Sequence, residues 1–346
     1  MAKAVLTLAL AAATEAAWAQ VDYSVVAVNE ETGLELTRIT QDNDYVCMPE
    51  VRRNAGNLNW LSNRIIDIST DGQRLAYLSA RNNTTNIFIK DVARQGSSVQ
   101  RTNRRAVIDF SYSPDGRYLC FSERSGDCNQ IFQTAAEGSY VCRQITSGNT
   151  DYSPVYTDDM KDIVFARQEN TGVSVWSYNV ANNFLANYTR GMNPCPIKGR
   201  KALLCARTDA SGRSEIWRVD YETGVEECLM ADPARSFTTP SVSPDGQWIL
   251  AVGSSVLMNG AQRYANTDIF VCRTDGTQLT QLTYHAADDL SPAWGRDGRH
   301  IYFISQRGSA TATANVWRMA FTLWKGEGID AIGKRKVMVN KLIEVV

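Results

Sequence analysis

A short turn motif recurs six times along the chain, and this repeat limits the fold more than any other feature of the sequence. Four clear copies place Asp-Gly before alternating apolar residues, and two weaker copies lie between them. The copies are Ser69–Tyr77, Ser113–Phe121, Thr157–Phe165, Ile197–Cys205, Ser243–Ala251 and Gly295–Phe303. Asp-Gly between alternating apolar residues predicts a β-hairpin, because glycine readily adopts the positive φ of a tight turn.

Two further markers run in step with the turns. Each copy is followed by a β-branched residue and an aromatic residue: Ile87-Phe88, Ile131-Phe132, Val175-Trp176, Ile216-Trp217, Ile269-Phe270 and Val316-Trp317. A strand of the type Leu279–Thr283 follows some copies, and a proline precedes four of the turns. Each period of 40 to 52 residues therefore holds about four short strands, which is typical of a propeller blade. The sequence predicts an all-β, six-bladed β-propeller over residues 20–323.

The ends of the chain suggest how the ring closes. No Leu-Thr strand follows Trp317, but an unused one, Leu36–Thr40, precedes the first copy. We expect this N-terminal strand to complete the last blade, which would leave few exposed sheet edges. Residues 336–346 also alternate and are a rival for this place, so residues 324–346 are expected to form a tail or an extra strand.

The first 19 residues have the layout of a signal peptide. Lys3 precedes the apolar run Ala4–Ala13, and Ala17 and Ala19 suit a cleavage site before Gln20. No later apolar run is long enough to span a bilayer. We therefore expect cleavage after Ala19 and a periplasmic or secreted protein. Its eight cysteines would meet an oxidising compartment, and their pairing is left open.

Charge and motifs exclude several classes of function. Lys and Arg number 36 against 37 Asp and Glu, so the chain lacks the basic surplus of a general nucleic-acid binder. No Walker loop, Gly-x-Gly-x-x-Gly, Gly-x-Ser-x-Gly or Cys-x-x-Cys motif occurs. The sequence predicts a non-catalytic protein without a cofactor or a metal.

The Ser-Pro-Asp-Gly turn, the upstream proline and the downstream Ile-aromatic pair resemble the TolB-like propeller repeat. The resemblance covers about residues 36–319 and implies the propeller fold. TolB itself carries an additional α/β domain, for which residues 20 to about 60 are too few, so we expect the propeller alone. The resemblance also implies a periplasmic protein that docks onto envelope proteins such as the peptidoglycan-associated lipoprotein.

One candidate site is a repeated charge pattern. An arginine follows the second strand in five copies, and two aspartates precede the first strand: Arg81, Arg124, Arg167, Arg207 and Arg307, with Asp151 and Asp289. In an up-and-down blade, both places fall on the face opposite the Asp-Gly turns. These side chains either pair between neighbouring blades or form a channel rim that captures acidic peptide or sugar groups through Arg contacts.

The loop before the last inner strand is a second candidate. His285, Asp288 and Asp289 lie together there and are the first suspects for carbohydrate binding or polysaccharide processing, the alternative function. Related propeller lyases use several metal-binding histidines, whereas this chain has only two histidines.

The third candidate is an insertion in the fifth copy, within residues 254–266. It contains Leu257, Met258 and Tyr264, and insertions in repeat proteins often lie on the binding face. The alternative is a loop that folds back on its own blade. The sequence favours an exported binding module for another envelope or peptidoglycan-associated protein, with this loop as a contact.

Overall fold

The computed structural model describes residues 26–28, 35–49, 64–94, 96–138, 140–259, 262–309 and 313–321. For residues 26–28, 35, 255–259 and 262–265 it describes the backbone alone. The predicted signal peptide and the 324–346 tail lie outside these residues. Within the described part of the chain, no helix has the length and apolar character needed to cross a bilayer.

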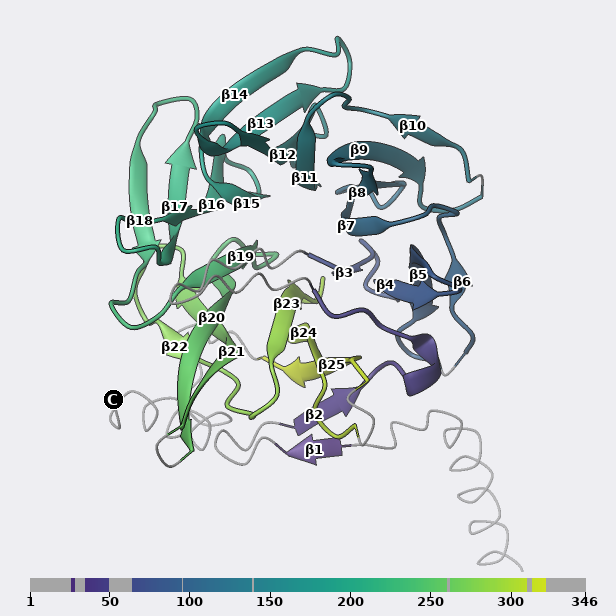
Figure 1. Ribbon diagram of the computed structural model, residues 1–346, viewed down its shortest axis with the longest axis vertical. Helices are drawn as coiled ribbons and strands as arrows, with labels where there is room; N and C mark the ends of the chain where they lie inside the picture. Colours follow the sequence, from purple (N-terminus) through teal and green to yellow (C-terminus); the bar gives the residue numbers. More distant parts are fainter. Residues whose placement is uncertain are drawn as a thin grey trace, which may run out of the picture.

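Six antiparallel sheets surround a common centre, which confirms the predicted six-bladed β-propeller (Figure 1). Blade 1 contains β3 (Ile66–Ile68), β4 (Arg74–Arg81), β5 (Thr84–Asp91) and β6 (Val99–Gln100). Blade 2 contains β7 (Val107–Tyr112), β8 (Tyr118–Ser125), β9 (Cys128–Ala135) and β10 (Cys142–Gln144). Blade 3 contains β11 (Thr150–Tyr156), β12 (Asp162–Glu169), β13 (Gly172–Asn179) and β14 (Leu185–Arg190).

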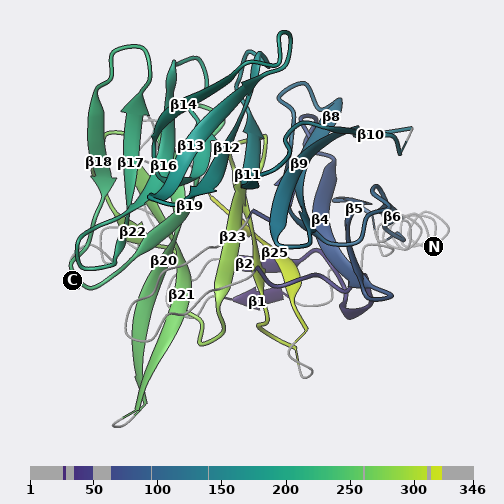
Figure 2. The ribbon, with the colours of Figure 1, turned by 45° about the horizontal axis from the view of Figure 1, so that its top comes forward.

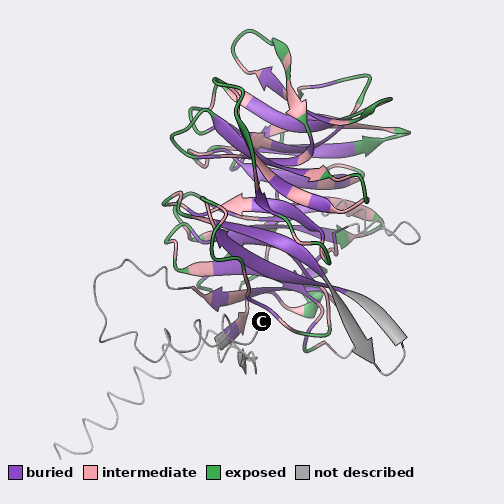
Figure 3. Ribbon diagram, turned by 90° about the vertical axis from the view of Figure 1, so that its left-hand side faces the viewer, coloured by how far each residue is buried: buried purple, intermediate pink, exposed green. Residues whose placement is uncertain are grey.

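The other three blades follow the same order. Blade 4 contains β15 (Met192–Pro196), β16 (Ala202–Thr208), β17 (Ser214–Asp220) and β18 (Glu226–Met230). Blade 5 contains β19 (Phe237–Val242), β20 (Trp248–Asn259), β21 (Gln262–Arg273) and β22 (Thr280–Gln281). Blade 6 contains β23 (Asp289–Trp294), β24 (His300–Ser305), β25 (Asn315–Ala320), β2 (Glu35–Arg38) and β1 (Val26–Val28). Buried residues run along the strands and exposed residues gather at the connections (Figure 3).

The Asp-Gly turns are held by their own side chains. In blade 1, Asp71 Oδ1 accepts hydrogen bonds from Ser69 Oγ at 2.5 Å and from the Gln73 amide at 3.0 Å. Gly72 follows with a φ of 73°, a left-handed conformation that suits glycine. Ser243 and Asp245 repeat the arrangement in blade 5. The Ser-x-Asp-Gly motif thus folds the first hairpin of the blade through contacts within four or five residues.

The prolines upstream of the turns mark bulges in the inner strands. The residue before each proline has a positive φ, with values between 49° and 54° at Ser153, Asn193, Thr239 and Ser291. The pairing with the second strand shifts its register at each of these places. A bulge redirects backbone and side-chain groups. In blade 6 the bulge directs the Ser291 side chain toward blade 1, where Ser291 Oγ accepts a hydrogen bond from the Ile65 amide at 2.9 Å.

Asp109 makes a similar contact between blades 2 and 3. It is completely buried, and its carboxylate accepts hydrogen bonds from Ser122 Oγ and, at 2.9 Å, from the Ser153 amide of the neighbouring blade. Burial raises the pKa of Asp109 to about 6, although both hydrogen bonds oppose this shift. The carboxyl group of Asp109 therefore keeps its proton to a higher pH in the folded protein than in the unfolded chain.

This shift predicts a pH-dependent stability. Because the pKa of Asp109 is higher in the folded state, its contribution to the free energy of unfolding decreases as the pH rises from about 4 to about 6. Replacing Asp109 with Asn removes the contribution. Between pH 4.5 and pH 7, the free energy of unfolding of Asp109→Asn should rise by about 2 kcal/mol relative to that of the wild type, as measured by urea unfolding.

A matched variant tests the cause of this effect. A hydrogen bond from Thr277 lowers the pKa of Asp275, which lies in an exposed turn. Asp275 is thus charged in both states over this pH range, and Asp275→Asn should show no such gain. An equal gain in both variants would contradict the burial argument.

The N-terminal strand completes the last blade, as predicted. β2 pairs antiparallel with β25, with Leu36 opposite Met319 and Arg38 opposite Trp317. β1 pairs with β2 and adds a fifth strand that the repeat did not predict. Residues 336–346, the rival for this place, lie outside the described residues.

Residues 39–47, which we call the latch, continue from β2 into the junction between blades 6 and 1. The Ile39 amide donates to Val316 O of blade 6 at 2.8 Å, and the Cys47 amide donates to Leu78 O of blade 1 at 3.0 Å. Val46 forms bridges to both Ser79 and Ala314. The latch also contains the single-turn helix η1 (Asp42–Asp44). It therefore connects the first and last blades through backbone hydrogen bonds on both sides.

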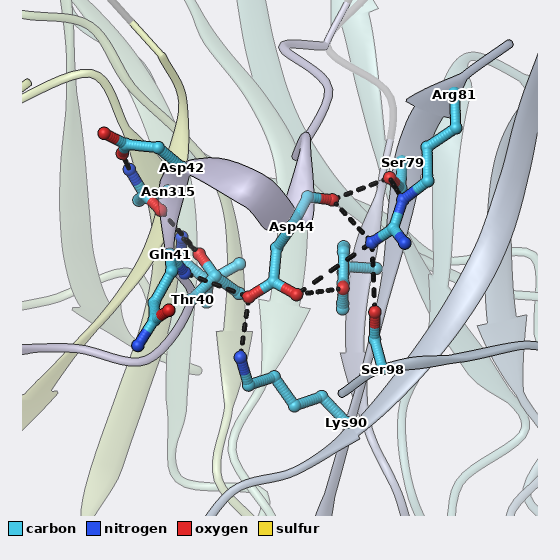
Figure 4. A network of polar contacts seen from close by, with 11 residues as sticks. Thr40, Gln41, Asp42, Asp44, Ser79, Arg81, Lys90, Ser98 and Asn315 are labelled. Carbon is cyan, nitrogen blue, oxygen red and sulfur yellow. Dashed lines mark hydrogen bonds and ion pairs between the residues drawn. The ribbon is translucent and has the colours of Figure 1, made fainter. Parts of the chain in front are cut away.

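A buried carboxylate lies at the centre of the latch (Figure 4). Asp44 is 4% exposed, and its Oδ2 atom is 2.6 Å from Lys90 Nζ. The same carboxylate accepts hydrogen bonds from the Tyr77 hydroxyl and the Gln41 amide, both at 2.9 Å. Arg81 contacts the Asp44 carbonyl oxygen at 3.2 Å. Asp44 thus ties the latch to two strands of blade 1.

We predict that Asp44→Ala strongly destabilises the protein. The change leaves the Lys90 ammonium buried without its carboxylate partner, which typically costs about 3–5 kcal/mol. Urea unfolding would measure the loss. Asp42→Ala is the matched control, because the Asp42 side chain is 54% exposed and its carboxylate has, within the described chain, only an ion pair with Arg38 at 3.6 Å and a hydrogen bond from Asn315 Nδ2 at 3.0 Å. The control should lose about 1 kcal/mol or less, and equal losses would refute a special role for Asp44.

The eight cysteines all lie in the described residues, and none of them forms a disulfide in the structure. Cys120, Cys205 and Cys272 are buried within blades, as expected for small apolar side chains. Burial raises the pKa of Cys120 to about 12 and that of Cys205 to about 11. Cys142 is partly exposed because β10 is an outer strand.

Candidate functional site

The ring has two faces with different connections. We call the face with the Asp-Gly turns, such as Ser69–Gly72, the turn face; it also carries the connections between third and fourth strands. We call the opposite face the hairpin face, because the second and third strands are joined there, as between Arg81 and Thr84. The predicted arginines lie at the hairpin-face ends of their strands.

Every blade places an arginine guanidinium over an aromatic ring. Four of these arginines are predicted site residues: Arg81 over Phe88, Arg167 over Trp176, Arg207 over Trp217 and Arg307 over Phe303, at 4.0, 4.7, 5.0 and 5.0 Å from the ring centroids. In the other two blades, Arg104 lies 4.4 Å from the Phe132 centroid and Arg235 lies 5.5 Å from that of Phe270. Five of the six rings belong to the Ile-aromatic marker. In five blades the aromatic residue of the marker therefore forms a cation–π contact with an arginine.

Each of these arginines also contacts a carboxylate. Arg167 makes two hydrogen bonds to Asp151, at 2.7 and 2.9 Å. The other pairs are Arg307 with Asp289, Arg207 with Glu226, Arg104 with Glu123, Arg235 with Asp232, and Arg81 with Asp44. The carboxylate comes from a different part of the structure in different blades, so its position does not repeat in the sequence. Sequence reasoning missed four of the six carboxylates for this reason. It missed Arg104 and Arg235 because they precede the first strand of their blades instead of following the second.

The expectation that these charges pair between neighbouring blades is wrong for both predicted aspartates. Asp151 lies directly opposite Arg167 across β11 and β12 of one blade. Asp289 and Arg307 also belong to one blade, blade 6. In each pair the aspartate lies on the first strand, and its arginine lies on or just after the second strand of the same sheet. These pairs therefore stabilise single blades.

The pairs differ in their access to solvent. Asp151 and Asp289 are completely buried, and Arg167 and Arg307 are 7% and 4% exposed. Arg124 is exposed, and Arg104 takes the stacked position in its blade. The contacts give most of these arginines a structural role, and their predicted part in binding acidic groups stays a prediction.

We predict that Arg167→Met destabilises the protein by about 3–5 kcal/mol, because Asp151 would remain buried without its partner. The double variant Arg167→Met, Asp151→Leu should recover much of the loss, since apolar residues often replace a buried ion pair well. Urea unfolding would measure both. Arg124→Met is the exposed control and should change the free energy of unfolding by about 0.5 kcal/mol or less. A loss for Arg124→Met equal to that of Arg167→Met would contradict this assignment.

The three predicted residues before and at the start of β23 are close in the chain, but their side chains have separate partners. They are His285, Asp288 and Asp289. His285 Nδ1 accepts from the Ala287 amide at 2.9 Å, and burial followed by the nearby Arg307 charge lowers the pKa of His285. Asp288 Oδ1 accepts from the Thr267 amide at 3.0 Å. Asp289 pairs with Arg307. Among the described residues, no three His, Cys, Asp or Glu side chains are grouped as metal ligands.

The insertion of blade 5 forms a long hairpin. β20 and β21 have 12 residues each, and their backbones pair continuously from Trp248–Arg273 to Asn259–Gln262. The ribbon extends from the hairpin face beyond the other blades (Figure 2). The expected alternative, a loop that folds back on its own blade, is wrong for the described backbone. Leu257, Met258 and Tyr264 lie on this ribbon, and their side chains are outside the described residues.

Exposed apolar side chains gather on the turn face, where sequence reasoning did not place a site. They lie at or just before the start of the fourth strand in blades 1 to 5: Val99, Tyr140, Val141, Phe184, Leu185, Val225 and Leu279. In the sequence, these positions appear as an apolar residue directly after the connection from the third strand. They do not stand out, because every alternating strand contains apolar residues.

Comparison with known proteins agrees with this architecture. Residues 27–196 match the family described as the TolB β-propeller domain. The Tol-Pal system protein TolB of Francisella tularensis subsp. holarctica is 24% identical over 212 residues, which are 60% of this chain and 47% of that protein. The uncharacterized peptidase YuxL of Bacillus subtilis is 26% identical over 193 residues, 52% of this chain and 28% of the relative. The chain thus spans about half or less of the length of these relatives.

Solved structures share the fold. A protein described as TolB from Agrobacterium tumefaciens superposes with a TM-score of 0.58 at 16% identity, covering 75% of this chain and 90% of that one. Oligogalacturonate lyase from Vibrio parahaemolyticus gives 0.57 at 12% identity, covering 86% and 96%. The fold is therefore found in proteins of different function.

Proposed function

Because the chain contains a TolB-like β-propeller, we propose that it is a non-catalytic binding module that docks onto another protein of the cell envelope. A propeller is a rigid ring whose connections are free to vary, so it suits the presentation of a binding surface. The relatives named for the Tol-Pal system support a protein partner. An exported, periplasmic location is part of this proposal.

The observation that carries the proposal is the long hairpin of blade 5. The second and third strands of the other five blades have six to eight residues, whereas β20 and β21 have 12. The pairing of β20 with β19 ends at Gly253, and that of β21 with β22 ends at Phe270. Beyond these points, no other strand of the described chain pairs with the ribbon. A projecting ribbon with two open edges is a suitable element for contact with another protein.

Shortening this hairpin tests the proposal. Residues 255–266 would be replaced by Asn-Gly, which joins the paired residues Ser254 and Thr267 through a two-residue turn. The control places Asn-Gly at Gly126-Asp127 in the short hairpin of blade 2, where Gly126 has a φ of 63° that Asn tolerates. Both proteins would be immobilised and exposed to an envelope extract of the source organism.

We expect one envelope protein to be enriched by the wild type and by the blade 2 variant, and lost with the shortened hairpin. Photo-crosslinking from position 257 or 264 should label the same protein. Equal retention by all three proteins would exclude the hairpin as the contact. Retention of polysaccharide instead of protein would favour the alternative function in carbohydrate binding.

A further inference from the structure

A cleft of about 320 Å³ lies on the turn face where blade 1 meets blade 2. One wall is the Asp-Gly turn of blade 1, with Ser69, Thr70 and Asp71, and the other contains Asp115 and Gly116 from the turn of blade 2. Ala136 and Glu137, which follow β9, complete it together with Arg74 and Tyr112. Thr70 Oγ1 donates to Pro114 O at 3.0 Å and fixes the two turns relative to each other. The cleft therefore exists only because two blades meet.

Charged side chains of both signs surround this cleft. Its lining contains the carboxylates of Asp71, Asp115 and Glu137 against one guanidinium, that of Arg74. Glu137 forms an ion pair with Arg74, and Asp115 forms one with Arg117, whose side chain is 73% exposed. Asp71 is different, because it makes no ion pair with any described residue.

The two oxygens of Asp71 have separate roles. Oδ1 holds the turn by accepting from Ser69 Oγ and the Gln73 amide, whereas Oδ2 accepts no hydrogen bond from another described residue. The bond from Ser69, followed by that from Gln73, lowers the pKa of Asp71, so the carboxylate is charged at neutral pH. One anionic oxygen thus remains available to a ligand at a fixed position.

Tyr112 adds a second unused polar group. The residue lines the cleft from β7 and is 5% exposed, and its hydroxyl has no hydrogen-bond partner in the described part of the chain. A buried hydroxyl without a partner costs about 1–3 kcal/mol. The hydroxyl oxygen has almost no exposed surface, so a ligand could offset this cost only if the ring shifted toward the cleft.

Apolar side chains lie next to the cleft. Tyr140 and Val141 belong to the same connection as Glu137 and are 55% and 77% exposed. The Arg101 guanidinium lies 5.0 Å from the centroid of the Tyr140 ring and supports it from the protein side. A ligand held in the cleft can therefore make apolar contacts at its edge.

We propose that this cleft binds a basic side chain, Arg or Lys, of the partner protein, with Asp71 as its ion-pair partner and an adjacent apolar residue packed on Tyr140 and Val141. The inference rests on the proposed function, since it specifies the chemistry of a protein partner. A metal ion fits less well, because Ca²⁺ takes 6–8 oxygen ligands and only one carboxylate oxygen here is both charged and unused. A long basic side chain needs only one carboxylate and can fill an elongated cleft.

The test uses the full mature chain and a defined probe. Acetyl-Leu-Arg-amide carries the proposed basic and apolar groups, and acetyl-Leu-citrulline-amide has nearly the same shape without the charge. Amide NMR shifts of Gly116, Ala136 and Glu137 would report binding in the cleft. We expect saturable shifts with the arginine peptide and an affinity at least fivefold lower with the citrulline peptide.

Two matched variants test the role of Asp71. Asn retains the Oδ1 acceptor, so Asp71→Asn should keep the turn while removing the charge. Asp245→Asn makes the same change in the equivalent turn of blade 5, outside the cleft. Asp71→Asn should weaken arginine-peptide binding at least fivefold, and Asp245→Asn should leave it unchanged.

Three results would overturn the inference: no saturable shift at the cleft residues, equal affinity for both peptides, or equal affinity of wild type and Asp71→Asn. Amide spectra that are unchanged away from the substituted turn show that each variant is folded. The hairpin experiment is independent of these results. Retention of the envelope partner by the shortened hairpin, with intact peptide binding, would refute the hairpin contact alone. Loss of the partner with the shortened hairpin, without peptide binding at the cleft, would refute the cleft alone.

Discussion

Closure of the ring depends on the buried ion pair between Asp44 and Lys90. A sheet can pair its strands internally, but six sheets in a circle must also join the last to the first. Here a short irregular segment makes this junction by bonding to the backbone on both sides, and irregular backbone is stable in a buried place only when its polar groups are satisfied. Asp44 satisfies the Gln41 amide of that segment while binding Lys90 and Tyr77 of blade 1. Asp44 thus holds in place the segment whose backbone bonds to both the first and the last blade.

The repeated arginines show how a pattern of charge serves the fold. Each guanidinium is positioned over an aromatic ring and beside a carboxylate, so that its charge is balanced while its flat surface covers the ring. Repetition of this unit in six blades is what a structural role predicts, since each blade has the same edge to cover. The long hairpin of blade 5 is not repeated in the other blades, and the cleft lies at the junction of blades 1 and 2. The proposed contacts with a partner lie at these irregular places, on opposite faces of the ring.

The number of blades and the closing strand could be predicted because they depend on local, repeated chemistry. Ser69, Asp71 and Gly72 form their turn within a few residues, and the same spacing recurs along the chain. The latch could not be predicted, because Asp44 and Lys90 are 46 residues apart and neither lies in a repeated pattern. The arginine positions were visible, but Arg167 and Trp176 come together only through the register of β12 and β13, in which Trp176 faces Phe165. The cleft depends on the contact between two blades, which no single repeat encodes.

Pairing of β2 with β25 has a consequence for the order of folding. Leu36 lies opposite Met319, so a strand that is synthesised before the six repeats must wait for one in the last repeat. Blades 1 to 5 are each built from consecutive strands and can form as the chain lengthens. Blade 6 cannot, and closing so long a loop carries an entropic cost that local hairpins avoid. The ring should therefore assemble as an open arc whose two ends meet in a final, slow step.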